Sequence, residues 1–104
     1  MNVTYNSLRF NLNTDISATG LVGEYDVSNE VCIRFVTERA TSGNVITVSG
    51  RIRGASTYDL LGTLTGLVNQ TVIVDTYDLI KIECTTYGSS ASSVKLIACS
   101  FNRL

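Results

Sequence analysis

Carboxylates and tyrosines are the side chains in this sequence whose spacing invites a chemical reading. Asp75 and Asp78 stand three positions apart, and Glu24 and Asp26 stand two apart in a strand-like run. A glycosidase needs two carboxyl groups held across a cleft, and a calcium site needs several converging oxygens. Neither pair meets these needs. We predict instead that Asp59 and Asp78 do turn chemistry, with their carboxylates accepting backbone N–H groups.

Histidine is absent, and there are three cysteines. The lack of histidine excludes Ser-His-Asp and Cys-His catalysis and removes the commonest zinc ligand. Cys32, Cys84 and Cys99 have no CxxC spacing, and an odd number is not a disulfide framework. We expect free thiols, with a Cys84–Cys99 bridge open if their strands pair. No phosphate-binding glycine motif occurs. The sequence therefore predicts a protein that is not an enzyme and needs no cofactor or metal.

Charge and hydrophobicity point to a partner surface. The chain has 104 residues, of which 44% are hydrophobic and 16% charged, against roughly 25% charged in an average globular protein. So few charges favour burial of part of the surface against a partner, and we expect a homo-oligomer. The net charge of −1 comes from scattered residues, which argues against nucleic acid and membrane surfaces as partners.

The first residues of the sequence and the length of its apolar runs add expectations about location. The first ten residues lack the charged and apolar regions of a signal peptide, so we expect synthesis in a cytoplasm. No apolar run approaches the roughly 20 residues of a membrane-spanning helix.

Strand-like runs separated by turn residues fill the sequence, and no segment has sustained helical periodicity. Alternation is cleanest over residues 31–39 and 45–53, with a turn at 41–44, so we predict a β-hairpin there. Asn69 and Gln70 are predicted to form another turn. The other expected strands cover residues 3–12, 16–18, 21–23, 24–27, 58–67, 71–75, 79–86 and 94–101.

About eight short strands at this spacing indicate an all-β fold, an antiparallel β-sandwich of jelly-roll-like type. We expect a single domain over residues 1–104, in which residues 1–14 are candidates for an N-terminal arm. The sequence Thr-Tyr-Asp-Leu occurs at both 57–60 and 76–79. Shared turn chemistry explains this echo more simply than an internal repeat.

Two arginines and two tyrosines are the first candidates for an interface. Arg51 and Arg53 share a strand face in this reading, where they could meet carboxylates of a neighbouring subunit. Tyr58 and Tyr77 are candidate aromatic anchors. The five tyrosines could alternatively form a sugar-stacking platform, which makes a carbohydrate-binding module a competing function.

The last expected strand, 94–101, is apolar on both faces. Such a strand is either central in its sheet or covered by a neighbouring subunit. Leu96 and Phe101 therefore complete the predicted interface.

Four segments of the second half resemble a small β-sandwich domain of virion structural proteins from tailed bacteriophages. They are VITVSGR (45–51), LLGTLTG (60–66), VIVDTYDLI (72–80) and LIACSF (96–101). The resemblance implies a capsid decoration or cement protein, present in the virion and bound to the major capsid protein, commonly as a trimer. A tail or fibre component, bound to a tail protein, is the alternative. Residues 1–27 depart from this pattern and suit an arm that packs on a neighbour.

Overall fold

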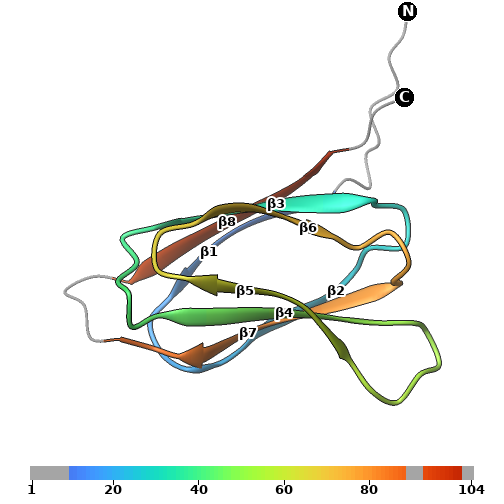
Figure 1. Cartoon of the computed structure of the whole chain (residues 1–104), viewed down its shortest axis with the longest axis horizontal. Coiled ribbons are helices and arrows are strands. Elements are labelled where there is room, and N and C mark those ends of the chain that lie inside the picture. The colour runs from blue at the N-terminus through green and yellow to red at the C-terminus, as the bar shows by residue number, and fades with distance from the viewer. Residues whose placement is uncertain (1–9, 89–92, 102–104) are drawn as a thin grey trace, which may run out of the picture.

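The computed structural model describes residues 10–88 and 93–101, with only the backbone of Phe101. These residues form eight strands in two antiparallel four-stranded sheets and no helix (Figure 1). The first four strands are β1 (Asn11–Ile16), β2 (Gly20–Asp26), β3 (Cys32–Glu38) and β4 (Val45–Arg51). The last four are β5 (Asp59–Thr65), β6 (Asn69–Ile73), β7 (Leu79–Thr86) and β8 (Val94–Phe101). The prediction of an all-β sandwich is confirmed.

The strand order identifies the sandwich as a jelly roll. Sheet A has the order β1-β8-β3-β6, and sheet B has the order β2-β7-β4-β5. Successive strands change sheet, except for β4 and β5, which pair within sheet B. Two interlocked Greek keys of eight strands produce this order. The connections therefore gather at the two ends of the sandwich (Figure 1).

The predicted hairpin of residues 31–39 and 45–53 is wrong. β3 pairs with β6 and β8, whereas β4 pairs with β5 and β7 in the other sheet. Each of these two strands has one fully buried face, Ile33 and Phe35 on β3 and Ile46 and Val48 on β4. Two apolar faces are buried when the strands oppose each other across the core. The connection turns through Arg39, which has a left-handed φ of 62°.

Other expected boundaries also change. β1 covers residues 11–16, so the predicted strand at 16–18 is the end of β1 and a turn. Residues 11–14 of the candidate arm pair with β8, and residues 1–9 lie outside the described residues. Asn69 and Gln70 begin β6, because the turn falls earlier, at Gly66 with a φ of 65°. The last two strands have the expected bounds.

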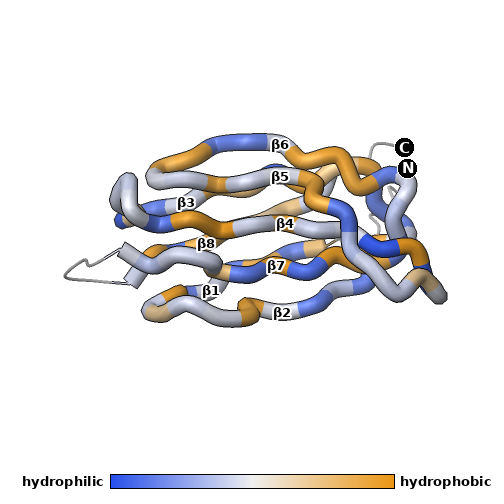
Figure 2. Tube along the Cα trace, turned by 60° about the horizontal axis from the view of Figure 1, so that its bottom comes forward, coloured by the Kyte–Doolittle hydropathy of each residue, from blue (hydrophilic) through white to orange (hydrophobic). Residues whose placement is uncertain are grey.

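The core lies between the sheets and follows the two-residue period of the strands. Figure 2 shows hydrophobic and hydrophilic residues alternating along β7. Ile80, Ile82 and Cys84 of this strand are buried. The outward residues of the same strand include Lys81 and Glu83. The buried apolar side chains are Phe10, Ile16, Val27, Ile33, Phe35, Ile46, Val48, Leu64, Val72, Val74, Ile80, Ile82, Cys84, Val94, Leu96 and Ala98.

A buried threonine joins the two sheets where the chain crosses from β5 to β6. The Thr37 hydroxyl donates to the Gly66 carbonyl at 2.7 Å and accepts the Val68 N–H at 2.9 Å. The Thr37 N–H donates to the Val68 carbonyl at 3.2 Å. These bonds satisfy backbone groups of Gly66 and Val68, which precede β6 and lie outside its ladder with β3.

Replacement of Thr37 by valine tests this junction. Valine keeps the shape but leaves the Gly66 carbonyl and the Val68 N–H without the hydroxyl. We expect T37V to lower the free energy of unfolding by about 1–3 kcal/mol, measured by urea denaturation. The control T63V changes an exposed threonine and should stay within about 0.5 kcal/mol of the parent. Equal effects of the two changes would contradict the assignment.

Candidate functional site

Four of the six predicted interface residues lie at one end of the sandwich. The β4–β5 loop and the β6–β7 turn meet there (Figure 1). We call this region the tyrosine end, and its residues are Arg51, Arg53, Tyr58, Asp59, Tyr77 and Asp78.

Tyr77 packs against Gly50 at this end. A Cβ atom on Gly50 would lie 2.8 Å from Cγ of Tyr77, so the ring rests against bare backbone. The Tyr77 hydroxyl donates to Oδ2 of Asp59 at 3.0 Å. This hydrogen bond to the carboxylate raises the pKa of Tyr77, with smaller effects from desolvation and from the Asp59 charge. The two Thr-Tyr-Asp-Leu segments thus meet, because β5 and β7 flank β4.

Asp78 forms hydrogen bonds with several segments that meet at the tyrosine end. Its Oδ2 accepts the Arg53 N–H at 2.7 Å, which confirms the predicted turn chemistry. Its N–H donates to the Arg51 carbonyl at 3.1 Å, and its carbonyl accepts the Val27 N–H at 2.8 Å. The side chain of Asp59, in contrast, accepts the Tyr77 hydroxyl. Asp78 therefore joins β2, β4 and β7 through a single residue.

Tyr58 lies against two cations on the outer side of sheet B. Nζ of Lys81 is 4.5 Å from the centre of its ring, and Cζ of Arg51 is 5.4 Å away. The Arg51 Nη1 donates to the Ala55 carbonyl at 3.0 Å. Among the described residues, the Tyr58 hydroxyl and Arg51 Nε are buried without a hydrogen-bond partner. The contacts of the Tyr58 ring with Lys81 and Arg51 are therefore made within the same chain.

Arg51 and Arg53 do not form the expected pair on one strand face. β4 ends at Arg51, and Arg53 lies in the following loop. Arg53 Nη2 is 2.9 Å from Oδ2 of Asp26, and both side chains are 61% exposed. The carboxylate that Arg53 meets thus belongs to the same chain. The prediction that the two arginines share a strand face is therefore wrong, and their role at an interface stays a prediction.

Asp26 is the second acidic anchor of this end. Its Oδ1 accepts the Ser28 hydroxyl and, at 3.0 Å, the Ser28 N–H. The Ser28 hydroxyl is the largest cause of a lowered pKa of Asp26, followed by the Ser28 N–H, with smaller help from Arg53. Both oxygens of the Asp26 carboxylate thus accept bonds within the chain, Oδ1 from Ser28 and Oδ2 from Arg53.

The remaining two predicted interface residues have different outcomes. Leu96 is 0% exposed and lies in the core, so its prediction as an interface residue is wrong. β8 is an interior strand between β1 and β3, and its inward face requires apolar residues such as Leu96. The Phe101 side chain lies outside the described residues.

The cysteines differ in burial and in the sheet to which they belong. Cys84 is buried on the inner face of sheet B, where burial raises the pKa of its thiol. Cys99 is exposed on sheet A, so the Cys84–Cys99 bridge is excluded. Cys32, Cys84 and Cys99 are all free.

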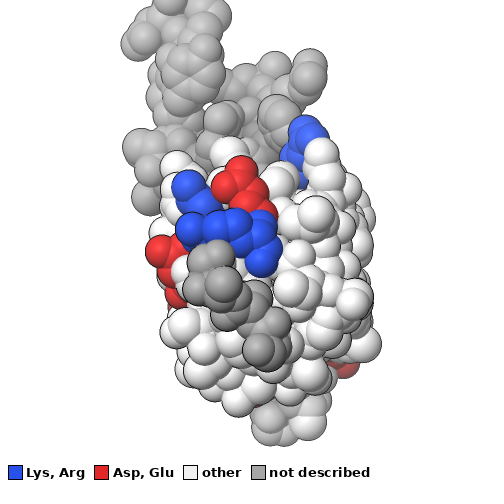
Figure 3. Space-filling view, turned by 90° about the vertical axis from the view of Figure 1, so that its left-hand side faces the viewer, with Lys and Arg blue, Asp and Glu red and all other residues white. Residues whose placement is uncertain are grey.

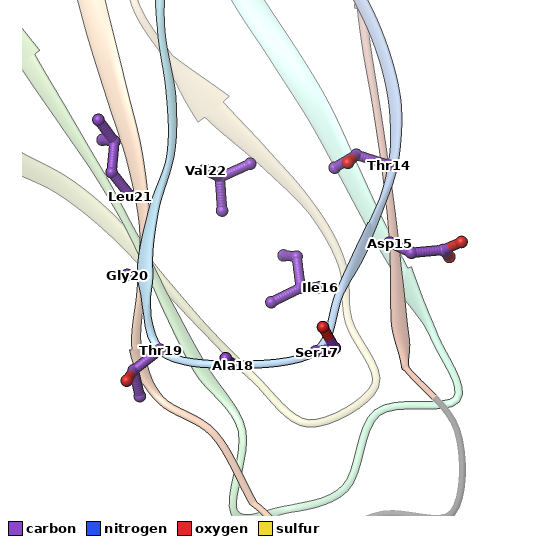
Figure 4. A pocket seen from close by; sticks show the side chains of 9 residues that line it. All are labelled: Thr14, Asp15, Ile16, Ser17, Ala18, Thr19, Gly20, Leu21 and Val22. Carbon is purple, nitrogen blue, oxygen red and sulfur yellow. The ribbon is translucent and has the colours of Figure 1, made fainter.

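A hollow of about 250 Å³ lies between β1 and β2. Figure 4 shows Ile16 and Val22 pointing into it and Asp15 and Leu21 pointing away. Its lining therefore has an apolar floor and no converging acid or base. A second hollow, of about 310 Å³, lies beside residues 26–30. Across residues 10–88 and 93–101, no three His, Cys, Asp or Glu side chains gather as a metal site.

Comparison with known proteins identifies no relative. No protein-family model matches the chain, and no curated protein or solved structure is significantly similar to it. The described residues contain no helix long and apolar enough to cross a membrane.

The packing of Tyr77 on Gly50 can be tested with a single methyl group. In G50A the new Cβ would lie 2.7 Å from Cδ1 of Leu61 and 2.8 Å from Cγ of Tyr77. We expect a loss of about 1–3 kcal/mol in the free energy of unfolding, as for overpacked cores. In G62A the nearest atom, Cγ2 of Val72, is 3.1 Å away, so a smaller loss is expected. A free energy of unfolding of G50A equal to that of the parent would contradict the packing of Tyr77 on Gly50.

The contacts of Asp26 predict a pH-dependent contribution to stability. The pKa of Asp26 is lower in the folded state than its ordinary value of 3.8. Its stabilising effect is therefore present above the unfolded pKa and lost as the pH falls through the folded pKa. D26N should be less stable than the parent at about pH 6, and the difference should disappear near about pH 2. S28A should reduce the same difference. A gap in unfolding free energy that persists in acid would contradict this.

Proposed function

We propose that this chain is a non-enzymatic structural protein of a virion. In this proposal it is a decoration or cement protein that binds the head shell of a tailed phage as a homo-oligomer. The observation that supports it is the outer face of sheet A. That face presents Cys32 and Val36 from β3, Ile97 and Cys99 from β8, and Ile73 from β6, which is 63% exposed.

An outer face of this kind differs from a solvated sandwich surface. Outward residues of a sandwich are normally polar, in alternation with the buried ones. On sheet B most outward residues are polar, among them Glu24, Lys81 and Glu83, and these fit that rule. The exposed Leu21 and Leu60 are its exceptions on that face. The apolar centre of sheet A suits contact with another protein. A cement protein that acts as a homo-oligomer can bury such area between its own copies.

The fold adds an argument by analogy. Jelly rolls occur both in viral capsid proteins and in lectins, and a fold by itself does not fix function. The tyrosine end favours the first of these classes. Tyr58 has two cations over its ring, and the ring of Tyr77 lies against Gly50. Both rings are thus already in contact with other groups of the chain, which makes them a poorer platform for a sugar.

The test is to find the chain in particles. Phage particles from the organism that encodes the sequence would be purified on a density gradient and analysed by mass spectrometry. We expect the chain in the particle band, and still on heads after the tails have been sheared away. Recovery with the sheared tails would favour the tail or fibre alternative. Absence from particles, together with binding on a glycan array, would favour a carbohydrate-binding module.

A further inference from the structure

The outward residues of β3 and β8 form the centre of sheet A's outer face. In the register of these two strands, Glu38 stands opposite Lys95, Val36 opposite Ile97 and Arg34 opposite Cys99. Arg34 Nε donates to Oδ1 of Asn69 at 2.7 Å, which holds its guanidinium toward β6. The face therefore has an apolar middle row and a charged row at one end.

The charged row belongs to a cluster at that end of the sandwich. Asp15 on β1 stands opposite Lys95 and forms an ion pair with Arg39 at 2.7 Å. Figure 3 shows cations and carboxylates grouped on one part of this end, with few charges around them. The opposite end of the face has Cys32 and Ile73, which are register partners. Apart from Arg34, the charges of this face thus lie at one end of the strands.

This pattern is complementary to itself about one particular axis. A two-fold axis parallel to the strands and midway between β3 and β8 exchanges these strands between two copies. Each residue then lies over the cross-strand partner of its counterpart. Glu38 meets Lys95, and Val36 meets Ile97. On the flanks, Asn69 of β6 meets Asn13 of β1, so amides face amides.

The other in-plane two-fold axis, perpendicular to the strands, gives a poor match. It would place the row of Glu38 and Lys95 over the end that contains Cys32 and Ile73. Charges would then lose water without gaining a partner, which is costly. The distribution of charge therefore selects the first axis.

We propose that two copies of this chain pair face to face through the outer faces of their A sheets, about the two-fold axis between β3 and β8. Such isologous contacts are the commonest way in which identical chains associate. The charges of Glu38 and Lys95 from both copies form an alternating quartet beside an apolar centre. The pair does not depend on the proposed role in a virion, since it rests on this surface alone.

Charge reversal tests the axis in solution, with the full chain followed by sedimentation velocity over a dilution series. The parent should sediment as a dimer. E38K makes all four members of the quartet cationic, and K95E makes all four anionic. Each variant by itself should weaken the dimer by about tenfold or more, because like charges are then juxtaposed. An equimolar mixture of E38K and K95E should recover dimers, since cations of one copy then face anions of the other.

The matched control is E24K, the same charge change on an exposed residue of sheet B's outer face. It should leave the dimer intact. Thermal unfolding by circular dichroism checks that every variant is folded, and the mixture reports on the interface even where one variant is destabilised. A monomeric or trimeric parent, unaffected single variants, or a mixture that stays monomeric would overturn the proposal. Particle binding by a monomer would still support the virion role, and a dimer absent from particles would refute that role alone.

Discussion

Burial of two apolar sheet faces against each other is the constraint on which this structure depends. Side chains along a strand alternate between the two sides of its sheet, and in each sheet one side is apolar and unfavourable in water. The order β1-β8-β3-β6 over β2-β7-β4-β5 brings these faces together. Strands that are adjacent in sequence are mostly placed in opposite sheets. The inner residues, including Ile33, Phe35, Val48 and Leu96, are buried as a result.

The crossings between sheets set a second requirement, because backbone groups leave the strand ladders there. Side chains take over where the ladders stop. Thr37 bonds to the β5–β6 connection, and Asp78 bonds to the β4–β5 loop. Asn44 is buried, and its Oδ1 accepts the Thr41 N–H at 2.7 Å. Polar residues in these turns therefore stabilise the ends of the sandwich. The aspartates of the tyrosine end have this same role.

The two outer faces then differ in what they offer. Sheet B presents mostly charged and hydroxyl-bearing residues, with Leu21 and Leu60 as exposed exceptions. Its Tyr58 is already in contact with Arg51 and Lys81. Sheet A presents an apolar centre, with its charges at one end. A protein with one mostly polar face and one face with an apolar centre is suited to contact another protein surface. This asymmetry links the sparing use of charge in the sequence to the proposed role in assembly.

The sequence by itself determined the fold class, most of the strands and the turn role of Asp78, because alternation and turn residues are local signals. Only the tertiary structure decided which strands pair. The segments at 31–39 and 45–53 read as a hairpin, since no local signal separates pairing within a sheet from opposition across a core. For the same reason, the apolar pattern of residues 94–101 predicts an interface role for Leu96, although Leu96 lies in the core. The partners of Arg53 and Tyr77 are distant in sequence, and the register that aligns Glu38 with Lys95 exists only once β3 and β8 are neighbours.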